Sequence, residues 1–160
     1  MRPNDIDAAL ESFGDTLDVN RDDLLQLFEL AGLSAAKRRV GHLTCNDIMS
    51  RDVITIAGYA PVEDARVLLR ARRLRALPVE NASGQLIGVI TWLELARHGV
   101  LASDIMEPAE TSHVNAPAAT LLAPLANGHG HEVMIVDDDM RLQGIVTQTD
   151  IVACLITDAI

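Results

Sequence analysis

Two hydroxyl–carboxylate pairs are the residues of this chain best suited to contact a ligand. Thr147 precedes Asp150 by three residues, and Thr91 precedes Glu94 by the same spacing. Each pair stands where an apolar run meets a predicted helix, whose free backbone N–H groups favour anionic ligands. The two oxygens of Asp150 can accept from two neighbouring hydroxyls of a ligand, and the Thr147 hydroxyl can cap the helix or contact the ligand. The alternative is structural, with Thr147 as a cap and Asp150 as an acid that complements the helix dipole.

An arginine-rich stretch is the second candidate for ligand contact. Five of the chain's 13 lysines and arginines fall within ten positions: Arg66, Arg70, Arg72, Arg73 and Arg75. In a chain with a net charge of −10, this stretch predicts a phosphate-facing patch. Arg75 is the preferred contact because it flanks a predicted strand. The alternative is a solvated helix face or the rim of an interface.

Other clusters favour structure over chemistry. His129 and His131 alternate with glycines, but no further ligand stands at a supporting metal spacing, so a polar loop is the first interpretation and metal-dependent hydrolysis the last. Residues 137–139 are three aspartates that suit a turn better than a calcium loop. Cys45 and Cys154 are predicted to be reduced and buried. The chain has no nucleophile elbow, phosphate loop or His-Glu-x-x-His, so we expect no enzyme, no metal and no cofactor.

The elements that position these residues occur twice. Three landmarks recur in the same order 56 or 57 positions later: Asp47-Ile48-Met49 at 104–106, Val79 at Val136, and Gly88-Val89-Ile90-Thr91 at 144–147. Shifts of one residue are what insertions and deletions in loops produce. The pattern therefore indicates a tandem duplication, with units at 43–99 and 100–157.

Each unit is predicted to fold as β-α-β-β-α. A short extended segment comes first, and a proline, Pro61 or Pro117, then starts a helix. Two apolar runs joined by a turn-rich connector form a hairpin, and a second helix closes the unit. The expected strands are 52–56, 74–79 and 86–90, then 110–114, 133–136 and 142–146; the expected closing helices are 92–97 and 148–156. Because neither unit can bury much surface alone, we expect one shared core.

Composition narrows the function classes. The 160 residues are 49% hydrophobic, which is enough for a substantial core. The net charge of −10 and an aromatic content of 2% disfavour nucleic-acid binding. No signal peptide or membrane-spanning run is evident, so a cytoplasmic location is expected. Residues 1–42 are expected to form a helical extension, with an amphipathic helix over 20–31 that packs on the module or on a second chain.

With these features the chain resembles tandem cystathionine β-synthase (CBS) domains, a pair known as a Bateman module. The resemblance rests on the Asp-Ile-Met starts, on Leu77-Pro78-Val79, and on the closing Gly-x-x-Thr-x-x-acid motifs. Residues 144–150 match the closing signature completely, whereas the first copy has Glu94 where Asp or Asn is expected. The implied fold class is α/β, with two β-α-β-β-α CBS repeats packed as a pseudo-two-fold pair.

The resemblance also implies that an adenine nucleotide (AMP, ADP or ATP) binds between the repeats. The closing motif of one repeat would face the first helix and middle strand of the other. Carried over by position, the binding residues are Ile145, Thr147, Thr149 and Asp150 with Ala65, Leu74, Arg75 and Ala76, and in the other cleft Thr91 and Glu94. S-adenosylmethionine or a dinucleotide is an alternative, since each presents an adenosine. The extra methylene of Glu94 is expected to displace its carboxylate, leaving one competent site and one degenerate site.

The predicted function is therefore regulatory. A nucleotide-sensing module would signal its ligand state to a partner domain or through rearrangement of a homodimer, the common assembly in the family. The alternative is a ligand-free dimerisation or interaction module. Residues 18–24 and 45–50 also faintly resemble the segment before the CBS pairs of bacterial HPP-family membrane proteins. On that analogy, the chain is the cytosolic tail of a membrane transport protein.

Overall fold

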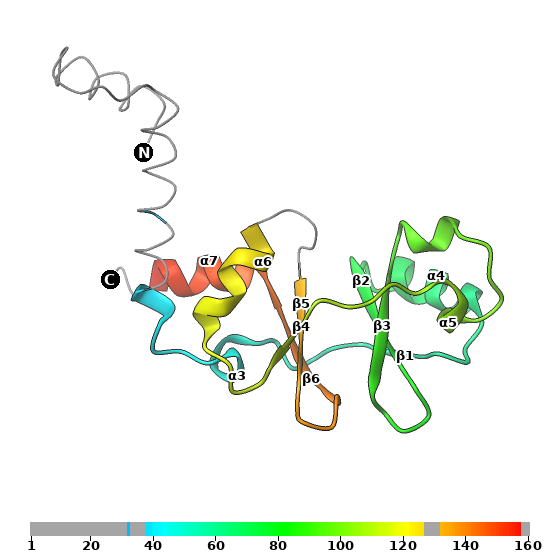
Figure 1. Cartoon of the computed structure of the whole chain (residues 1–160). Coiled ribbons are helices and arrows are strands. Elements are labelled where there is room, and N and C mark those ends of the chain that lie inside the picture. Colours follow the sequence, from blue (N-terminus) through cyan, green and yellow to red (C-terminus); the bar gives the residue numbers. More distant parts are fainter. Residues whose placement is uncertain (1–31, 33–37, 127–131, 158–160) are drawn as a thin grey trace, which may run out of the picture.

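The computed structural model describes residues 32, 38–126 and 132–157. Two three-stranded sheets lie side by side at the middle of the molecule, and helices gather at its two ends (Figure 1). The elements of the first half are α3 (Cys45–Ile48), β1 (Ile56–Ala57), α4 (Val62–Ala71), β2 (Ala76–Glu80), β3 (Leu86–Thr91), the 3₁₀ turn η2 (Glu94–Ala96) and α5 (Ala102–Ile105). Those of the second half are β4 (Thr111–His113), the 3₁₀ turn η3 (Ala118–Leu121), α6 (Leu122–Ala126), β5 (Glu132–Val136), β6 (Leu142–Thr147) and α7 (Gln148–Thr157). The helix predicted over 20–31 and the loop with His129 and His131 lie outside the described residues.

The two sheets have the same topology, which confirms the α/β repeat. In each sheet the middle strand pairs parallel with the first strand and antiparallel with the third. The register also shifts at the same place in both hairpins, directly after Val79 and directly after Ile135. Val79 therefore corresponds to Ile135 in the repeat. The predicted equivalence of Val79 and Val136 is wrong by one residue. The error arises because the second apolar run extends one position further, to a buried Val136 where the first repeat has Glu80.

The closing elements of the two repeats differ in length. The second repeat closes with the ten-residue helix α7, as predicted, but the first closes only with the three-residue turn η2. The helix predicted over 92–97 is thus too long. Trp92 and Leu93 are 51% and 80% exposed, so this segment lacks the continuous apolar stripe that stabilises a helix by packing.

The two Asp-Ile-Met segments form short helices, α3 and α5, that the sequence analysis did not predict. Asp47 caps α3 by accepting hydrogen bonds from the Thr44 backbone N–H (2.8 Å) and hydroxyl (2.7 Å). Asp104 accepts from the backbone N–H groups of Val100 (3.0 Å) and Leu101 (2.8 Å) at the start of α5. An acid at the third position of each helix therefore satisfies N–H groups that would otherwise have no partner.

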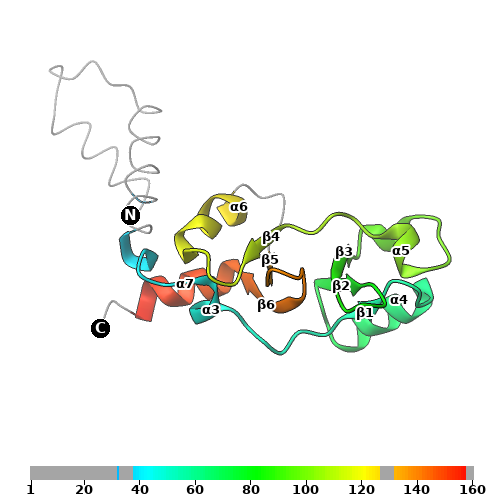
Figure 2. The same cartoon turned by 60° about the horizontal axis from the view of Figure 1, so that its bottom comes forward.

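Each of these short helices packs in the core of the other repeat (Figures 1 and 2). From α3, Cys45 and the following Met49 join a buried cluster of the second repeat, and Ile105 of α5 joins the buried cluster of the first. A third, smaller cluster joins the two sheets: Leu86, Met134 and Val136. The prediction of one shared core is therefore wrong. Each repeat has its own core, which includes residues of one short helix from the other repeat.

Candidate functional site

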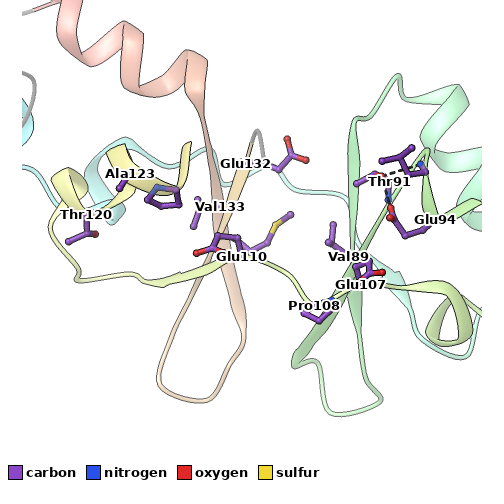
Figure 3. A pocket seen from close by; sticks show the side chains of 13 residues that line it. Val89, Thr91, Glu94, Glu107, Pro108, Glu110, Thr120, Ala123, Glu132 and Val133 are labelled. Carbon is purple, nitrogen blue, oxygen red and sulfur yellow. Dashed lines mark hydrogen bonds between the residues drawn. The ribbon is translucent and has the colours of Figure 1, made fainter. Parts of the chain in front are cut away.

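A cleft of about 780 Å³ opens between the two repeats (Figure 3). We call it the first cleft. One wall comes from the end of β3 and the turn after it, and the other comes from η3, α6 and β5 of the second repeat. The segment that links the repeats passes between these walls. The lining residues are Val89, Thr91, Leu93, Glu94, Glu107, Pro108, Glu110, Thr120, Ala123, Pro124, Glu132, Val133 and Met134.

Thr91 and Glu94 form a capping pair in the wall of the first cleft. Glu94 is only 7% exposed, and its Oε2 accepts hydrogen bonds from the Thr91 backbone N–H (2.7 Å) and the Thr91 hydroxyl. Burial raises the pKa of the Glu94 carboxyl, but the hydrogen bonds from Thr91 and the Arg97 charge lower it by more, so the net pKa lies below the usual value. The pair therefore presents an ionised carboxylate at the cleft.

Thr147 and Asp150 form the same pair in the second repeat. Asp150 Oδ2 accepts from the Thr147 backbone N–H (2.7 Å) and from the Thr147 hydroxyl (2.7 Å). The extra methylene of Glu94 thus leaves these two hydrogen bonds in place. Both acids thus cap the start of the closing segment, and this role engages one oxygen of each carboxylate.

A smaller cleft of about 190 Å³ lies at Thr147, and we call it the second cleft. It is lined by Arg75, Glu132, Thr147, Gln148 and Thr149. The structure thus brings together three of the predicted residues, Arg75, Thr147 and Thr149. The larger cleft lies at the motif with Glu94, which was expected to form the degenerate site.

The other predicted residues lie around the two clefts. Ala76 and Ile145 pack against the cluster that joins the sheets. Leu74 packs on the first core, and its carbonyl accepts a hydrogen bond from the Trp92 indole (3.2 Å). Ala65 is fully buried in that core and lines neither cleft.

The far wall of the first cleft adds residues that were not among the predicted binding residues. Thr120, Ala123 and Pro124 come from the first helical segment of the second repeat, and Val133 and Met134 come from its middle strand. By position, these segments correspond to the first helix and middle strand that were predicted for the cleft at Thr147, so the repeat itself carried the signal for them. Among the described residues, no group of three His, Cys, Asp or Glu side chains is arranged to hold a metal ion.

Replacing Glu94 by glutamine tests the capping pair. Because its pKa is lowered in the fold, ionised Glu94 contributes stability above the unfolded-state pKa of about 4.3 and loses that contribution as the pH falls through the folded value. We expect Glu94→Gln to reduce the free energy of unfolding by about 1–2 kcal/mol at pH 7. The difference from wild type should shrink below about pH 4, as measured by denaturant unfolding.

An equal difference in the free energy of unfolding at pH 3 and pH 7 would exclude the Glu94 carboxylate as its source. Glu63→Gln is the control, since the Glu63 side chain is 72% exposed and pairs only with nearby Arg66.

The fold and the cleft define a class: a tandem α/β repeat that holds a ligand-sized cleft between its halves. The CBS domain model matches this chain twice, over residues 45–100 and 102–157. The chain therefore belongs to the CBS domain family.

A curated relative shares part of this sequence, and several solved structures share its fold. The chain is 32% identical over 108 residues to inosine-5′-monophosphate dehydrogenase from Thermoplasma acidophilum, a match that covers 66% of this chain but only 22% of the enzyme. The structure of CBSX2 in complex with AMP matches with a TM-score of 0.67 and 21% identity, over 73% of this chain and 98% of that one. The CBS domain pair of protein MJ0100, in complex with 5′-methylthioadenosine and S-adenosylmethionine, matches with a TM-score of 0.63 and 26% identity, over 72% and 97%. The CBS domain of a bacterial CNNM/CorC family Mg²⁺ transporter in complex with ATP matches with a TM-score of 0.66 and 21% identity, over 80% and 97%.

Within the described ranges, no helix is both long and apolar enough to cross a bilayer.

Proposed function

We propose that this chain is a regulatory module, without catalytic activity of its own, that binds an adenosine ligand in the first cleft. The observation that carries the proposal is the cleft itself. Its volume of about 780 Å³ falls within the range of roughly 300–1,000 Å³ that is typical of small-molecule sites. The second cleft, at about 190 Å³, falls below that range, so it has the secondary role in this proposal.

The lining of the first cleft suits a nucleoside. Val89, which is half-buried, and Leu93, which is exposed, offer apolar surface for a flat base. Thr91 engages Oε2 of Glu94, and the other carboxylate oxygen is the group we assign to the ribose hydroxyls. The complexes of similar CBS structures with AMP, ATP, S-adenosylmethionine and 5′-methylthioadenosine support adenosine as the shared part of the ligand.

Binding in this cleft gives a route to regulation. The walls come from different repeats, so a ligand that contacts both favours one relative arrangement of the two sheets. A partner domain or a second copy in a homodimer that contacts both repeats would sense this change. A cytoplasmic location and a regulated enzyme or membrane partner complete the proposal.

Thermal unfolding with adenosine, AMP, ADP, ATP, S-adenosylmethionine and 5′-methylthioadenosine tests the proposed function. A ligand at 100 times its Kd stabilises the folded state by about 2.7 kcal/mol, which raises Tm by roughly 5–10 °C in a chain of this size. We expect this rise with at least one of the six ligands. Ala123→Phe, which fills the first cleft from an exposed lining position, should abolish it.

Thr149→Phe is the matched control, because Thr149 is an exposed lining residue of the second cleft. This variant should keep the ligand-induced rise. Loss of the rise in Thr149→Phe but not in Ala123→Phe would move the site to the second cleft. No rise with any ligand, from a cooperatively folded protein, would contradict the proposal and favour the dimerisation or interaction module.

A further inference from the structure

We infer that the first cleft selects adenosine ligands whose 5′ group carries no negative charge and rejects nucleoside phosphates. The inference rests on the proposed function and adds the chemical class of the ligand. A thioether nucleoside or a sulfonium nucleoside would satisfy it. AMP, ADP and ATP, the ligands expected from the family resemblance, would not.

The charge of the lining is the first observation. Four carboxylates line the first cleft, those of Glu94, Glu107, Glu110 and Glu132 (Figure 3). Among the described residues, no lysine, arginine or histidine lines it. Arg97 forms an ion pair with Glu107 from outside the lining. A phosphate placed here would meet a surplus of like charge, partly shielded from solvent by the walls.

The shortage of hydrogen-bond donors is the second, independent observation. Phosphate recognition needs N–H or O–H donors directed at the oxygens. The two hydroxyls of the lining are already engaged, because Thr91 donates to Glu94 and Thr120 donates to the Pro117 carbonyl (2.7 Å). Two backbone N–H groups of the lining are also engaged, that of Glu107 with Val89 O and that of Met134 with Glu110 O. The remaining acceptors suit a cationic or neutral group instead.

The second cleft provides the contrast within the same molecule. The exposed Arg75 lies there beside the exposed Thr149. The Thr147 hydroxyl is engaged with Asp150, and Glu132 lines both clefts. A guanidinium beside a hydroxyl can donate to phosphate oxygens, and no guanidinium of the described residues lines the first cleft. Any nucleoside phosphate held by this chain should therefore be held at the second cleft, and the two related clefts would differ in the charge they accept.

Isothermal titration of the full chain carrying Thr149→Phe tests the inference at the first cleft alone. The ligands are adenosine, 5′-methylthioadenosine, S-adenosylmethionine and AMP, with ATP added with and without Mg²⁺. We expect AMP and ATP to bind at least tenfold more weakly than adenosine, and S-adenosylmethionine to bind at least as tightly as adenosine. The difference between AMP and S-adenosylmethionine should narrow when the salt is raised from 50 to 500 mM.

Glu110→Gln supplies the matching variant, because Glu110 is an exposed lining residue. Glu110→Gln should raise the AMP affinity severalfold relative to the adenosine affinity. Glu63→Gln, outside the cleft, should leave the ratio of the two affinities unchanged.

Three results would overturn the inference. The first is AMP binding as tightly as adenosine, the second is Mg²⁺–ATP binding more tightly than adenosine, and the third is an unchanged ratio in Glu110→Gln. In all three the proposed function survives, since adenosine ligands still bind. If adenosine, 5′-methylthioadenosine and S-adenosylmethionine all fail to bind, the proposed function and the inference fall together.

Discussion

Ile105→Ala should lower the free energy of unfolding by about 2–5 kcal/mol. Ile105 is fully buried and packs in a cluster with Leu69 and Leu77 of the first repeat, although it follows the start of the second copy in sequence. Truncation removes a buried side chain and leaves a cavity that the surrounding strands and helices can fill only in part. We expect Tm to fall by roughly 5–15 °C in a calorimetric scan.

Val100→Ala is the control for this prediction. Val100 lies five residues earlier in the same segment, but its side chain is 76% exposed. Its truncation should change the free energy of unfolding by less than about 0.5 kcal/mol. Equal effects of the two substitutions would show that α5 is not part of the first core. They would contradict the finding that each repeat contributes a short helix to the core of the other.

Gly88→Ala and Gly144→Ala should each destabilise the fold by about 1–3 kcal/mol. A Cβ at Gly88 would lie 2.7 Å from the Glu107 carbonyl oxygen, and a Cβ at Gly144 would lie 2.8 Å from the Ser50 carbonyl oxygen. Both carbonyls belong to segments that cross from one repeat to the other, and each is tied down by hydrogen bonds next to the glycine. Val89 and Glu107 exchange two backbone hydrogen bonds of 2.9 Å, and Ser50 and Ile145 do the same. A methyl group would push each crossing segment away and weaken both bonds.

Two comparisons make the glycine prediction specific. Gly32→Ala should be neutral or slightly stabilising, because a Cβ there meets nothing within 4 Å and the residue is helical. Met106→Ala should not rescue Gly88→Ala in denaturant unfolding. The Met106 side chain also lies close to the added methyl, at 2.8 Å, but the Glu107 carbonyl stays where it is. A full rescue would show that only side-chain crowding, and not the backbone crossing, requires glycine.

The order of elements could be predicted because its signals are local. Pro61 and Pro117 mark where a helical segment begins, the connectors at 81–85 and 137–141 mark the hairpins, and the repeated motifs set the two units in phase. The short closing turn after Thr91 could not be predicted in the same way. A helix at that place needs a core surface that packs over Trp92 and Leu93. Both residues are exposed in the fold, and the local sequence does not reveal this exposure.

The sequence by itself determined the duplicated α/β architecture, the CBS family, and the two threonine–acid pairs, because each is encoded in residues a few positions apart. Only the tertiary structure decided which core receives Ile105 and Cys45, why Gly88 and Gly144 are glycines, and which cleft is large. Those features depend on where segments distant in the sequence meet, such as Gly88 with Glu107 and Gly144 with Ser50, and no local pattern records such a meeting. The same holds for the charge of the first cleft, whose four glutamates come from 94, 107, 110 and 132 and lie around one volume only when the two repeats pack together.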